Sequence, residues 1–355
     1  MDFTIQNART SRNASDVSVL IVYTGGTIGM VYDERGSLQP FDIGHVLEKI
    51  PELRELDLQI TVISFPQPID SSNINEEDWK NLGQIIYENY DRYDGFVVLH
   101  GTDTMAYSAS AMSFMFEGLK KPIIFTGAQI PIGQLRSDAR ENMITALEMA
   151  SAREDGEPLI KEVAIYFNFV LLRGNRAQKV RSSTFAAFQS ENYPNLANSG
   201  IFIEYFPSNI LKPKKKARLK FCPCFDPNVI ILKVFPGIKT KAIRHALSMP
   251  GLKGVVLETF GSGNTPSADW FLDLIAKAIN KGVVVFNVSQ CSGGEVIQGR
   301  YATSKKLEEI GVVSGGDITS EAAVTKLMFL LGKEKDPEQI RQLLQRPLRG
   351  EMDFQ

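Results

Sequence analysis

Two short threonine-bearing segments decide how this chain folds: Tyr23-Thr24-Gly25-Gly26-Thr27-Ile28-Gly29-Met30 and His100-Gly101-Thr102-Asp103-Thr104-Met105. Each follows an apolar, β-branched run, residues 17–22 for the first and 96–99 for the second. This pattern predicts two turns at the carboxyl ends of buried strands, where open parallel sheets bind their ligands. Glycine lets the backbone turn sharply and approach a ligand closely. A threonine hydroxyl at such a turn faces the ligand site rather than the packed core. Both segments are therefore candidate nucleophile sites.

The bulk composition points to a globular enzyme with two domains. At 355 residues the chain exceeds the size at which one hydrophobic core stops growing. Hydrophobic residues make up 43% and charged residues 23%, a balance far from that of disordered chains. The formal net charge of −2 argues against a protein built mainly to hold nucleic acid or an anionic membrane. We therefore expect no nucleic-acid partner and no membrane partner.

The N-terminus and the cysteines indicate a cytoplasmic protein. Residues 1–16 are polar and lack the apolar core of a signal peptide. No apolar run reaches 18 residues, so no membrane-spanning segment is expected. Cys222 and Cys224 are too closely spaced for the usual zinc pairs, and Cys291 stands apart. We expect no metal and reduced, structural thiols.

Strands and helices alternate along the chain, which predicts βαβ units and parallel sheets. The first part has predicted strands at 17–23, 58–64, 96–100, 122–126 and 163–167, and helices at 43–50, 76–90, 105–117 and 137–152. The second part has predicted strands at 229–234, 254–258 and 283–288, and helices at 240–247, 268–280, 304–310, 320–331 and 337–345.

A charged, Pro-interrupted stretch from Lys212 to Lys220 separates the two parts. A nucleic-acid tail is one interpretation, but the near-neutral balance elsewhere favours a solvated linker. The sequence thus predicts an α/β protein with a larger N-terminal parallel-sheet domain, 1–210, a linker, 211–226, and a smaller C-terminal α/β domain, 227–355.

The glycines of Gly25-Gly26-Thr27-Ile28-Gly29 also invite a dinucleotide interpretation, but they miss the G-x-G-x-x-G spacing, and no P-loop follows. Either threonine turn alone could be a structural turn. Further polar groups follow other predicted strands: Asp70-Ser71-Ser72-Asn73, the Asp103 carboxylate beside Thr102, and Lys179. A lysine there is usually a solvated surface residue, but a neutral one next to two hydroxyls could act as a base.

Five segments together resemble the L-asparaginases of the cytosolic, type I group: Thr24-Gly25-Gly26-Thr27-Ile28-Gly29-Met30, Asp70-Ser71-Ser72, His100-Gly101-Thr102-Asp103-Thr104-Met105-Ala106, Arg173-Gly174-Asn175-Arg176 with Lys179, and Phe260-Gly261-Ser262-Gly263-Asn264. The resemblance extends from about residue 19 to about residue 351, nearly the whole chain. The first and third segments together are highly specific. The fold of this family is a larger N-terminal and a smaller C-terminal α/β domain, as the pattern above predicts.

The resemblance implies roles for individual residues. Thr27 is the primary nucleophile, and Thr102, Asp103 and Lys179 form a second, hydrogen-bonded catalytic group. Asp103 with Thr102 also holds the substrate ammonium end, while Asp70, Ser71 and Ser72 hold the α-carboxylate end. In type I relatives a tyrosine of the C-terminal domain belongs to the site, and Tyr301 fits it.

The chemistry of these groups is coherent with amide hydrolysis. An amide is a poor electrophile, so its nucleophile needs activation and its oxyanion needs peptide N–H donors. Backbone N–H groups around Gly101 and Thr102 could supply the donors, and a neutral Lys179 could accept a hydroxyl proton. Three scattered histidines do not favour a Ser-His-Asp relay, and His100 is interpreted as a packing residue.

The leading hypothesis is conversion of L-asparagine to L-aspartate and ammonia through an acyl-threonine intermediate, with no cofactor. One alternative is the amidase subunit of a tRNA-dependent amidotransferase. Such subunits carry an extra N-terminal domain, whereas about 18 residues precede the first predicted strand here. Another alternative is a non-catalytic asparagine sensor, which the retained threonines, Asp103 and Lys179 disfavour.

The resemblance also implies an assembly and a regulatory site. Family members form intimate homodimers, often paired into homotetramers. Some type I relatives bind a second asparagine at a dimer-interface pocket, and Arg244 and Cys291 stand at the matching positions of a possible effector site. Gln178 departs from the threonine that those relatives carry before the catalytic lysine, which predicts weak or absent cooperativity. The polar, Gly-bounded loop 30–38 is the expected lid.

Overall fold

A computed structural model describes residues 3–9, 17–29, 31–32, 38–39, 50–214, 216–299 and 302–353. The chain divides into two compact units, Met1–Pro223 and Cys224–Gln355. The division falls inside the segment that the sequence predicts as a linker. Within that segment β17 (Lys220–Phe221) pairs antiparallel with β7 (Phe116–Glu117) of the first unit.

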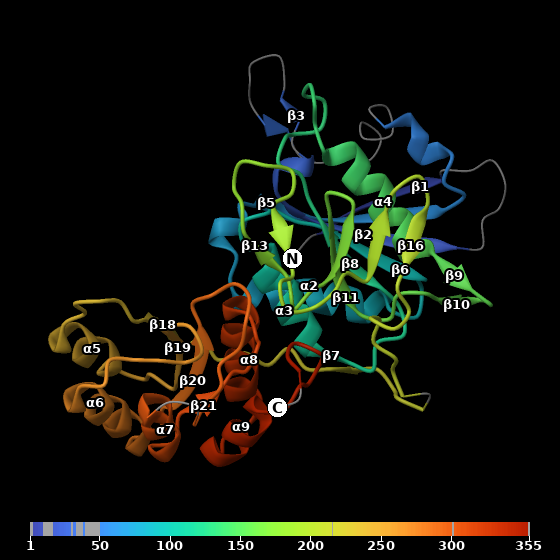
Figure 1. The fold of residues 1–355 in the computed structure, drawn as a ribbon. Coiled ribbons are helices and arrows are strands. Elements are labelled where there is room, and N and C mark those ends of the chain that lie inside the picture. The colour runs from blue at the N-terminus through green and yellow to red at the C-terminus, as the bar shows by residue number, and fades with distance from the viewer. Residues whose placement is uncertain are drawn as a thin grey trace. The chain divides into compact units, whose positions relative to one another are not determined.

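The first unit is built on a nine-stranded sheet, in the order β1-β5-β2-β6-β8-β11-β12-β15-β16. The five strands from β5 to β11 in this order are parallel to their neighbours, and the pairs beyond them at both edges are antiparallel (Figure 1). Their bounds are Thr4–Arg9 (β1), Ser18–Gly25 (β2), Gln59–Ile69 (β5), Gly95–Leu99 (β6), Ile123–Thr126 (β8), Val163–Phe167 (β11), Val170–Arg173 (β12), Ala197–Ser199 (β15) and Ile203–Tyr205 (β16).

The chain order of the parallel strands creates a switch point between β2 and β6. After β2 the chain adds β5 on one side, then crosses over to add β6, β8 and β11 on the other side. In open α/β sheets, ligands bind outside the carboxyl ends of the strands at such a reversal. Both threonine segments follow these two strands, so the fold places them at the position where a ligand is expected.

Helices cover the two faces of this sheet because its central parallel strands are apolar and buried on both faces. On one face α4 (Ala139–Ser151) packs Met143 and Leu147 against strand residues such as Val97 and Ile124. The helices α2 (Glu76–Asn89) and α3 (Met105–Met115) contact one another, and α3 also contacts β8 and β11. The Asn75 side chain begins α2 with a capping box.

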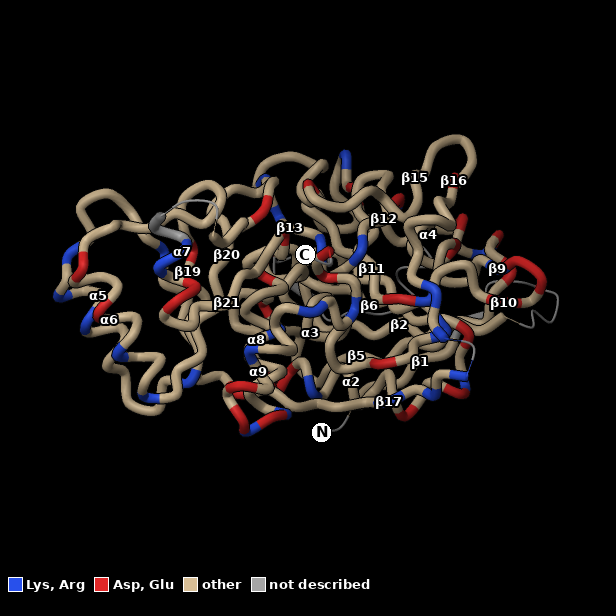
Figure 2. Tube along the Cα trace, turned by 60° about the horizontal axis from the view of Figure 1, so that its bottom comes forward, with Lys and Arg blue, Asp and Glu red and all other residues tan. Residues whose placement is uncertain are grey.

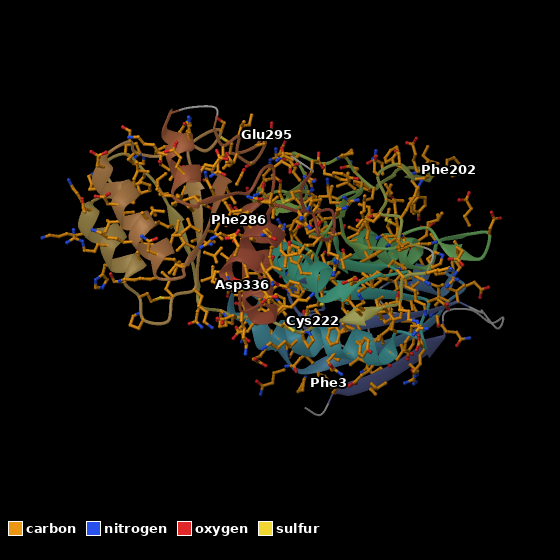
Figure 3. All side chains as sticks on the ribbon, turned by 90° about the horizontal axis from the view of Figure 1, so that it is seen from below. Phe3, Phe202, Cys222, Phe286, Glu295 and Asp336 are labelled. Atoms are coloured by element: carbon orange, nitrogen blue, oxygen red, sulfur yellow. The ribbon has the colours of Figure 1, made fainter. Side chains whose placement is uncertain are left out.

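Short elements complete the first unit. They are the 3-10 turns η1 (Thr27–Gly29), η2 (Pro51–Arg54) and η3 (Ser71–Asn73), and the two-stranded pairs β3 (Val31–Tyr32) with β4 (Leu38–Gln39), β9 (Arg153–Glu154) with β10 (Glu157–Pro158), and β13 (Gln178–Lys179) with β14 (Phe188–Gln189). Phe202 lies between β15 and β16, and its side chain is 86% exposed (Figure 3).

The second unit is a four-stranded parallel sheet in chain order, β18-β19-β20-β21. In Figure 1, α5 and α6 lie on one side of this sheet and α8 on the other. Buried residues such as Val255, Phe271 and Val285 form the core. The elements are Val229–Lys233 (β18), Thr240–Leu247 (α5), Gly254–Thr259 (β19), Asp269–Asn280 (α6), Val284–Ser289 (β20), Ala302–Glu309 (α7), Val313–Ser314 (β21), Ser320–Lys333 (α8) and Pro337–Leu344 (α9).

The expected fold class is confirmed: a larger N-terminal sheet domain and a smaller C-terminal α/β domain. Several details differ from expectation, including the antiparallel edge strands β1, β12, β15 and β16, which the local patterns do not predict. The helix predicted over 105–117 ends at Met115, because the next two residues pair with β17. Cys222 and Cys224 are disulfide-bonded, so the expectation of reduced thiols is wrong for this pair, whose close spacing brings the sulfur atoms together. The predicted helix 43–50 lies outside the described residues except for its last position.

Charges of both signs are interspersed along both units, as Figure 2 shows. This agrees with the nearly equal numbers of basic and acidic residues, 39 and 41. Within the described ranges, no helix combines the length and the apolar character that crossing a membrane requires.

Candidate functional site

The two threonine turns touch through the glycines that precede Thr27 and Thr102. Gly26 adopts a φ of +86°, a conformation that side chains rarely tolerate. A Cβ atom at Gly26 would collide with the backbone of Gly101. Because Thr27 and Thr102 each follow one of these glycines, the close approach brings both threonine segments to one place at the switch point.

The segment after β5 packs against the same backbone. A Cβ atom at Gly101 would collide with the Ser71 side chain, and the Thr104 hydroxyl donates a 2.7 Å hydrogen bond to the Ser71 carbonyl. Asp70 begins η3 by accepting a 3.0 Å hydrogen bond from the Ser72 N–H. This N–H holds the pKa of the Asp70 carboxyl below its usual value. The predicted carboxylate-binding residues therefore adjoin the second threonine turn.

Lys179 reaches Thr102 and Asp103 from β13. Its Nζ atom donates to the Thr102 Oγ1 atom at 2.8 Å and to the Asp103 Oδ1 atom at 2.6 Å. The Lys179 side chain is 15% exposed, whereas the Asp103 side chain is 66% exposed. The ion pair thus joins a largely covered ammonium to a carboxylate that remains open to a ligand.

Gln129 completes this group, although nothing in its sequence context marks it as a site residue. Its Oε1 atom accepts from the Thr102 hydroxyl at 3.3 Å, and its Nε2 atom donates to the Thr184 carbonyl at 3.0 Å. Gln129 follows β8, the next parallel strand after β6. The rule that ligands gather at strand ends is the signal that could have found it.

His100 is fully buried and contacts the backbone of the second threonine turn. Its Nδ1 atom lies 2.6 Å from the Gly101 carbonyl and its Nε2 atom 2.8 Å from the Ser108 hydroxyl, which also accepts from the Trp79 indole at 2.9 Å. Burial lowers the pKa of His100 to about 4, so the ring is neutral near pH 7. A neutral ring can donate from Nδ1 and accept at Nε2, which satisfies both contacts. These contacts fit the interpretation of His100 as a packing residue.

The remaining predicted residues are found in β13, in the second unit or outside the described ranges. Arg244 is exposed on α5, and Cys291 is exposed after β20, with its N–H donating to the Ser289 hydroxyl at 3.0 Å. Gln178 belongs to β13 of the first unit. Tyr301, and residues 30 and 33–37 of the predicted lid, lie outside the described residues. In the described ranges, no three His, Cys, Asp or Glu side chains group as metal ligands would.

The arrangement brings together threonine hydroxyls, an amine and an exposed carboxylate beside glycine-containing backbone. An amine that donates to a hydroxyl can, after losing its proton, accept one from it. The open carboxylate can hold a cationic group of a ligand by a charge-assisted hydrogen bond. Glycine-rich backbone at strand ends can present N–H groups to a developing oxyanion. These capabilities are those required for acyl transfer.

Comparison of the sequence with family models and known relatives identifies the family of the chain. Residues 18–210 match the model described as Asparaginase, N-terminal, and residues 228–344 match the glutaminase/asparaginase C-terminal domain. L-asparaginase 1 of Escherichia coli K12 is 41% identical over 339 residues, covering 94% of this chain and 98% of the relative. A glutamyl-tRNA(Gln) amidotransferase chain of Sulfolobus acidocaldarius is 31% identical over 351 residues, covering 96% of this chain and 77% of that relative.

Structural comparison agrees. The crystal structure of L-asparaginase I from Vibrio cholerae superposes with a TM-score of 0.86 at 39% identity, covering 96% of this chain and 100% of that one. The family models, the relatives and the structural comparison agree, and this chain belongs to the asparaginase family.

Proposed function

We propose that this protein is an amidohydrolase that converts L-asparagine to L-aspartate and ammonia through a threonine nucleophile. The observation that carries the proposal is the Lys179 ammonium bonded to both Thr102 and Asp103, beside the turn that holds Thr27. An amine, two hydroxyls and an open carboxylate match the needs of amide hydrolysis on a substrate that carries its own ammonium group. No cofactor takes part in the proposed reaction.

Binding begins with the charged ends of the amino acid. The substrate α-ammonium contacts the open Asp103 carboxylate, and the α-carboxylate contacts the polar segment Asp70-Ser71-Ser72, where peptide N–H groups and hydroxyls serve as donors. The incoming ammonium competes with Lys179 for Asp103 and places a second positive charge nearby.

Acylation forms the bond between Thr27 Oγ1 and the side-chain amide carbon of asparagine. The carbon–nitrogen bond breaks, and the Thr27 hydroxyl proton reaches the departing nitrogen, so that ammonia leaves. Backbone N–H groups around Gly101 and Thr102 stabilise the oxyanion of the tetrahedral intermediate. Lys179 and Thr102 carry the proton between the two atoms.

Deacylation reverses the roles of the reacting groups. A water molecule gives a proton to the same base and attacks the acyl carbon. The ester bond to Thr27 breaks, the hydroxyl recovers its proton, and L-aspartate leaves. The sum of both steps is one asparagine and one water converted to aspartate and an ammonium ion. Tyr301 is the further catalytic residue that the family resemblance implies.

A second candidate function is that of an amidotransferase component, since such a protein is a relative of this chain. A third candidate is an asparagine sensor without turnover. Ammonia release by the purified protein alone separates the three. The proposed hydrolase releases ammonia from L-asparagine at steady state, the amidotransferase component needs its partner and a charged tRNA for full activity, and a sensor binds without release.

The proposed cellular setting is a homodimer or homotetramer in the cytoplasm, as the family resemblance implies. Sedimentation velocity measures the assembly directly. A single monomeric species at the concentrations used in activity assays would contradict this part of the proposal.

A further inference from the structure

Gln129 occupies a rigidly held segment between β8 and α4. The Gln129 N–H donates to both carboxylate oxygens of Asp138 at 3.0 Å, and the Ile130 N–H donates to one of them at the same distance. Asn142 links this anchor to the Gly127 carbonyl at 2.9 Å. The backbone from which the Gln129 side chain extends is therefore fixed on both sides.

The two contacts of the side chain determine which way its amide points. The Thr184 carbonyl can only accept a hydrogen bond, so the group facing it at 3.0 Å is the Nε2 donor. The Oε1 atom then faces Thr102 and can only accept. The Thr102 hydroxyl must therefore be the donor in this contact, and the Gln129 amide orientation follows from chemistry.

The orientation of the Gln129 amide determines which group is the donor in the hydrogen bond between Thr102 and Lys179. A hydroxyl has one proton, and the Thr102 proton is directed to Gln129. Lys179 is therefore the donor in the 2.8 Å contact, as it is toward Asp103. In this state Thr102 offers Lys179 a lone pair rather than its proton.

We propose that Gln129 is a positioning residue that holds the Thr102 hydroxyl proton and so sets the direction of the Thr102–Lys179 hydrogen bond. The inference rests on the proposed hydrolysis, in which Thr102 must later pass a proton to Lys179. The hydroxyl reaches that state by rotating about its Cβ–Oγ1 bond, away from Gln129. The 3.3 Å contact is longer than the about 2.7–2.8 Å typical of hydroxyl donors, so releasing the proton costs little.

The same side chain also ties two loops together. Thr184 lies between β13 and β14, in the hairpin whose first strand carries Lys179. By spanning from Thr102 to this hairpin, Gln129 holds the amine and the hydroxyl at a fixed separation. Loss of the side chain should therefore lower turnover through Thr102 without removing any proposed substrate contact.

The test compares two variants at this position with a matched control. Gln129→Met keeps the length of the side chain but removes donor and acceptor, and should lower kcat for L-asparagine about ten-fold, the usual effect of one hydrogen bond. Gln129→Glu keeps an acceptor for Thr102 but loses the donor toward Thr184, so its kcat should lie above that of Gln129→Met. Gln134→Met makes the same change at an exposed position of the following loop and should leave kcat unchanged.

L-aspartate affinity, measured by calorimetry, separates positioning from substrate contact. The dissociation constant and the melting temperature of Gln129→Met should match those of the parent. The inference is overturned if kcat stays within two-fold of the parent, if affinity falls as much as kcat, or if Gln129→Glu is no better than Gln129→Met. Failure of the parent itself to release ammonia would instead contradict the proposed function.

Discussion

Lys179 and Thr102 are 77 positions apart in the sequence, yet the Nζ atom of the lysine lies 2.8 Å from the threonine hydroxyl. The contact joins β13, a short hairpin strand, to the turn that follows β6. The Lys179 side chain is 15% exposed and donates hydrogen bonds to two acceptors, unlike an ordinary solvated surface lysine. Its placement gives the proposed mechanism a base next to a hydroxyl.

Replacing Lys179 should lower turnover strongly but preserve ligand binding. Lys179→Met keeps an unbranched stem of similar length and should lower kcat by about 10³-fold, within the range for loss of a general base. L-aspartate should still bind, as calorimetry can measure. Lys80→Met, which removes only an exposed ion pair with Glu77, serves as the control. Turnover above a tenth of the parent value would exclude Lys179 as the base.

Asp103 should contribute to affinity as well as to turnover. Its carboxylate is 66% exposed and is the proposed partner of the substrate ammonium. Asp103→Asn removes a charge-assisted hydrogen bond, which contributes about 1.5–3 kcal/mol, and should weaken L-aspartate binding by more than ten-fold. Asp91→Asn changes an exposed acid after α2 and should leave affinity unchanged. Equal affinity of Asp103→Asn and parent would show that another acid holds the amino group.

The buried His100 should make the first unit less stable in mild acid. Its pKa is lowered from 6.5 to about 4 in the folded protein, so between these values the unfolded chain binds more protons. The contribution of His100 to the free energy of unfolding is therefore constant above about pH 6.5 and falls as the pH drops toward 4. This one group accounts for a loss of about 2 kcal/mol between about pH 7 and about pH 5.

Urea unfolding can isolate this effect, because the sequence has two tryptophans, one in each unit. A Trp270→Phe background leaves Trp79 to report on the first unit. In that background His100→Gln should show a smaller loss of stability in acid than the parent, while His245→Gln, an exposed change on α5, should not. Identical pH dependence of parent and His100→Gln would contradict the assignment.

Asparagine saturation should be hyperbolic or nearly so. The possible effector residues Arg244 and Cys291 are both exposed in the second unit, but Gln178 replaces the threonine expected before Lys179. Allosteric coupling needs an effector that favours one state by about 1–3 kcal/mol. Initial rates over a wide asparagine range measure the Hill coefficient. A clearly sigmoidal curve that Arg244→Ala makes hyperbolic would refute the prediction.

Local patterns predicted most of the fold, because each unit is made of strongly periodic elements. The strand Val163–Phe167 and the helix Thr240–Leu247 have the bounds that their apolar spacing indicates. The helix predicted to reach Glu117 stops earlier, because Phe116 and Glu117 pair with residues about 100 positions away. Pairing at that separation leaves no signal in a local window.

In the site, too, local sequence patterns reveal some residues, and only long-range contacts reveal others. Threonines and glycines at strand ends were visible in the sequence, whereas the switch point follows from the strand order, which the structure supplies. Gln129 was not, because a glutamine two positions after Gly127 resembles any polar loop residue. Its importance arises only from contacts with Thr102 and Thr184, which distant parts of the chain supply.

Ammonia release from L-asparagine, compared between the parent protein and Thr27→Ala, tests the central claim most directly. The parent should release ammonia and L-aspartate in equal amounts, with no partner and no added cofactor. Thr27→Ala should fold and bind L-aspartate but lose turnover by about 10³-fold or more, because it lacks the attacking oxygen. Thr61→Ala, on β5, should behave like the parent. No ammonia from the parent, or near-parental turnover by Thr27→Ala, would contradict the account.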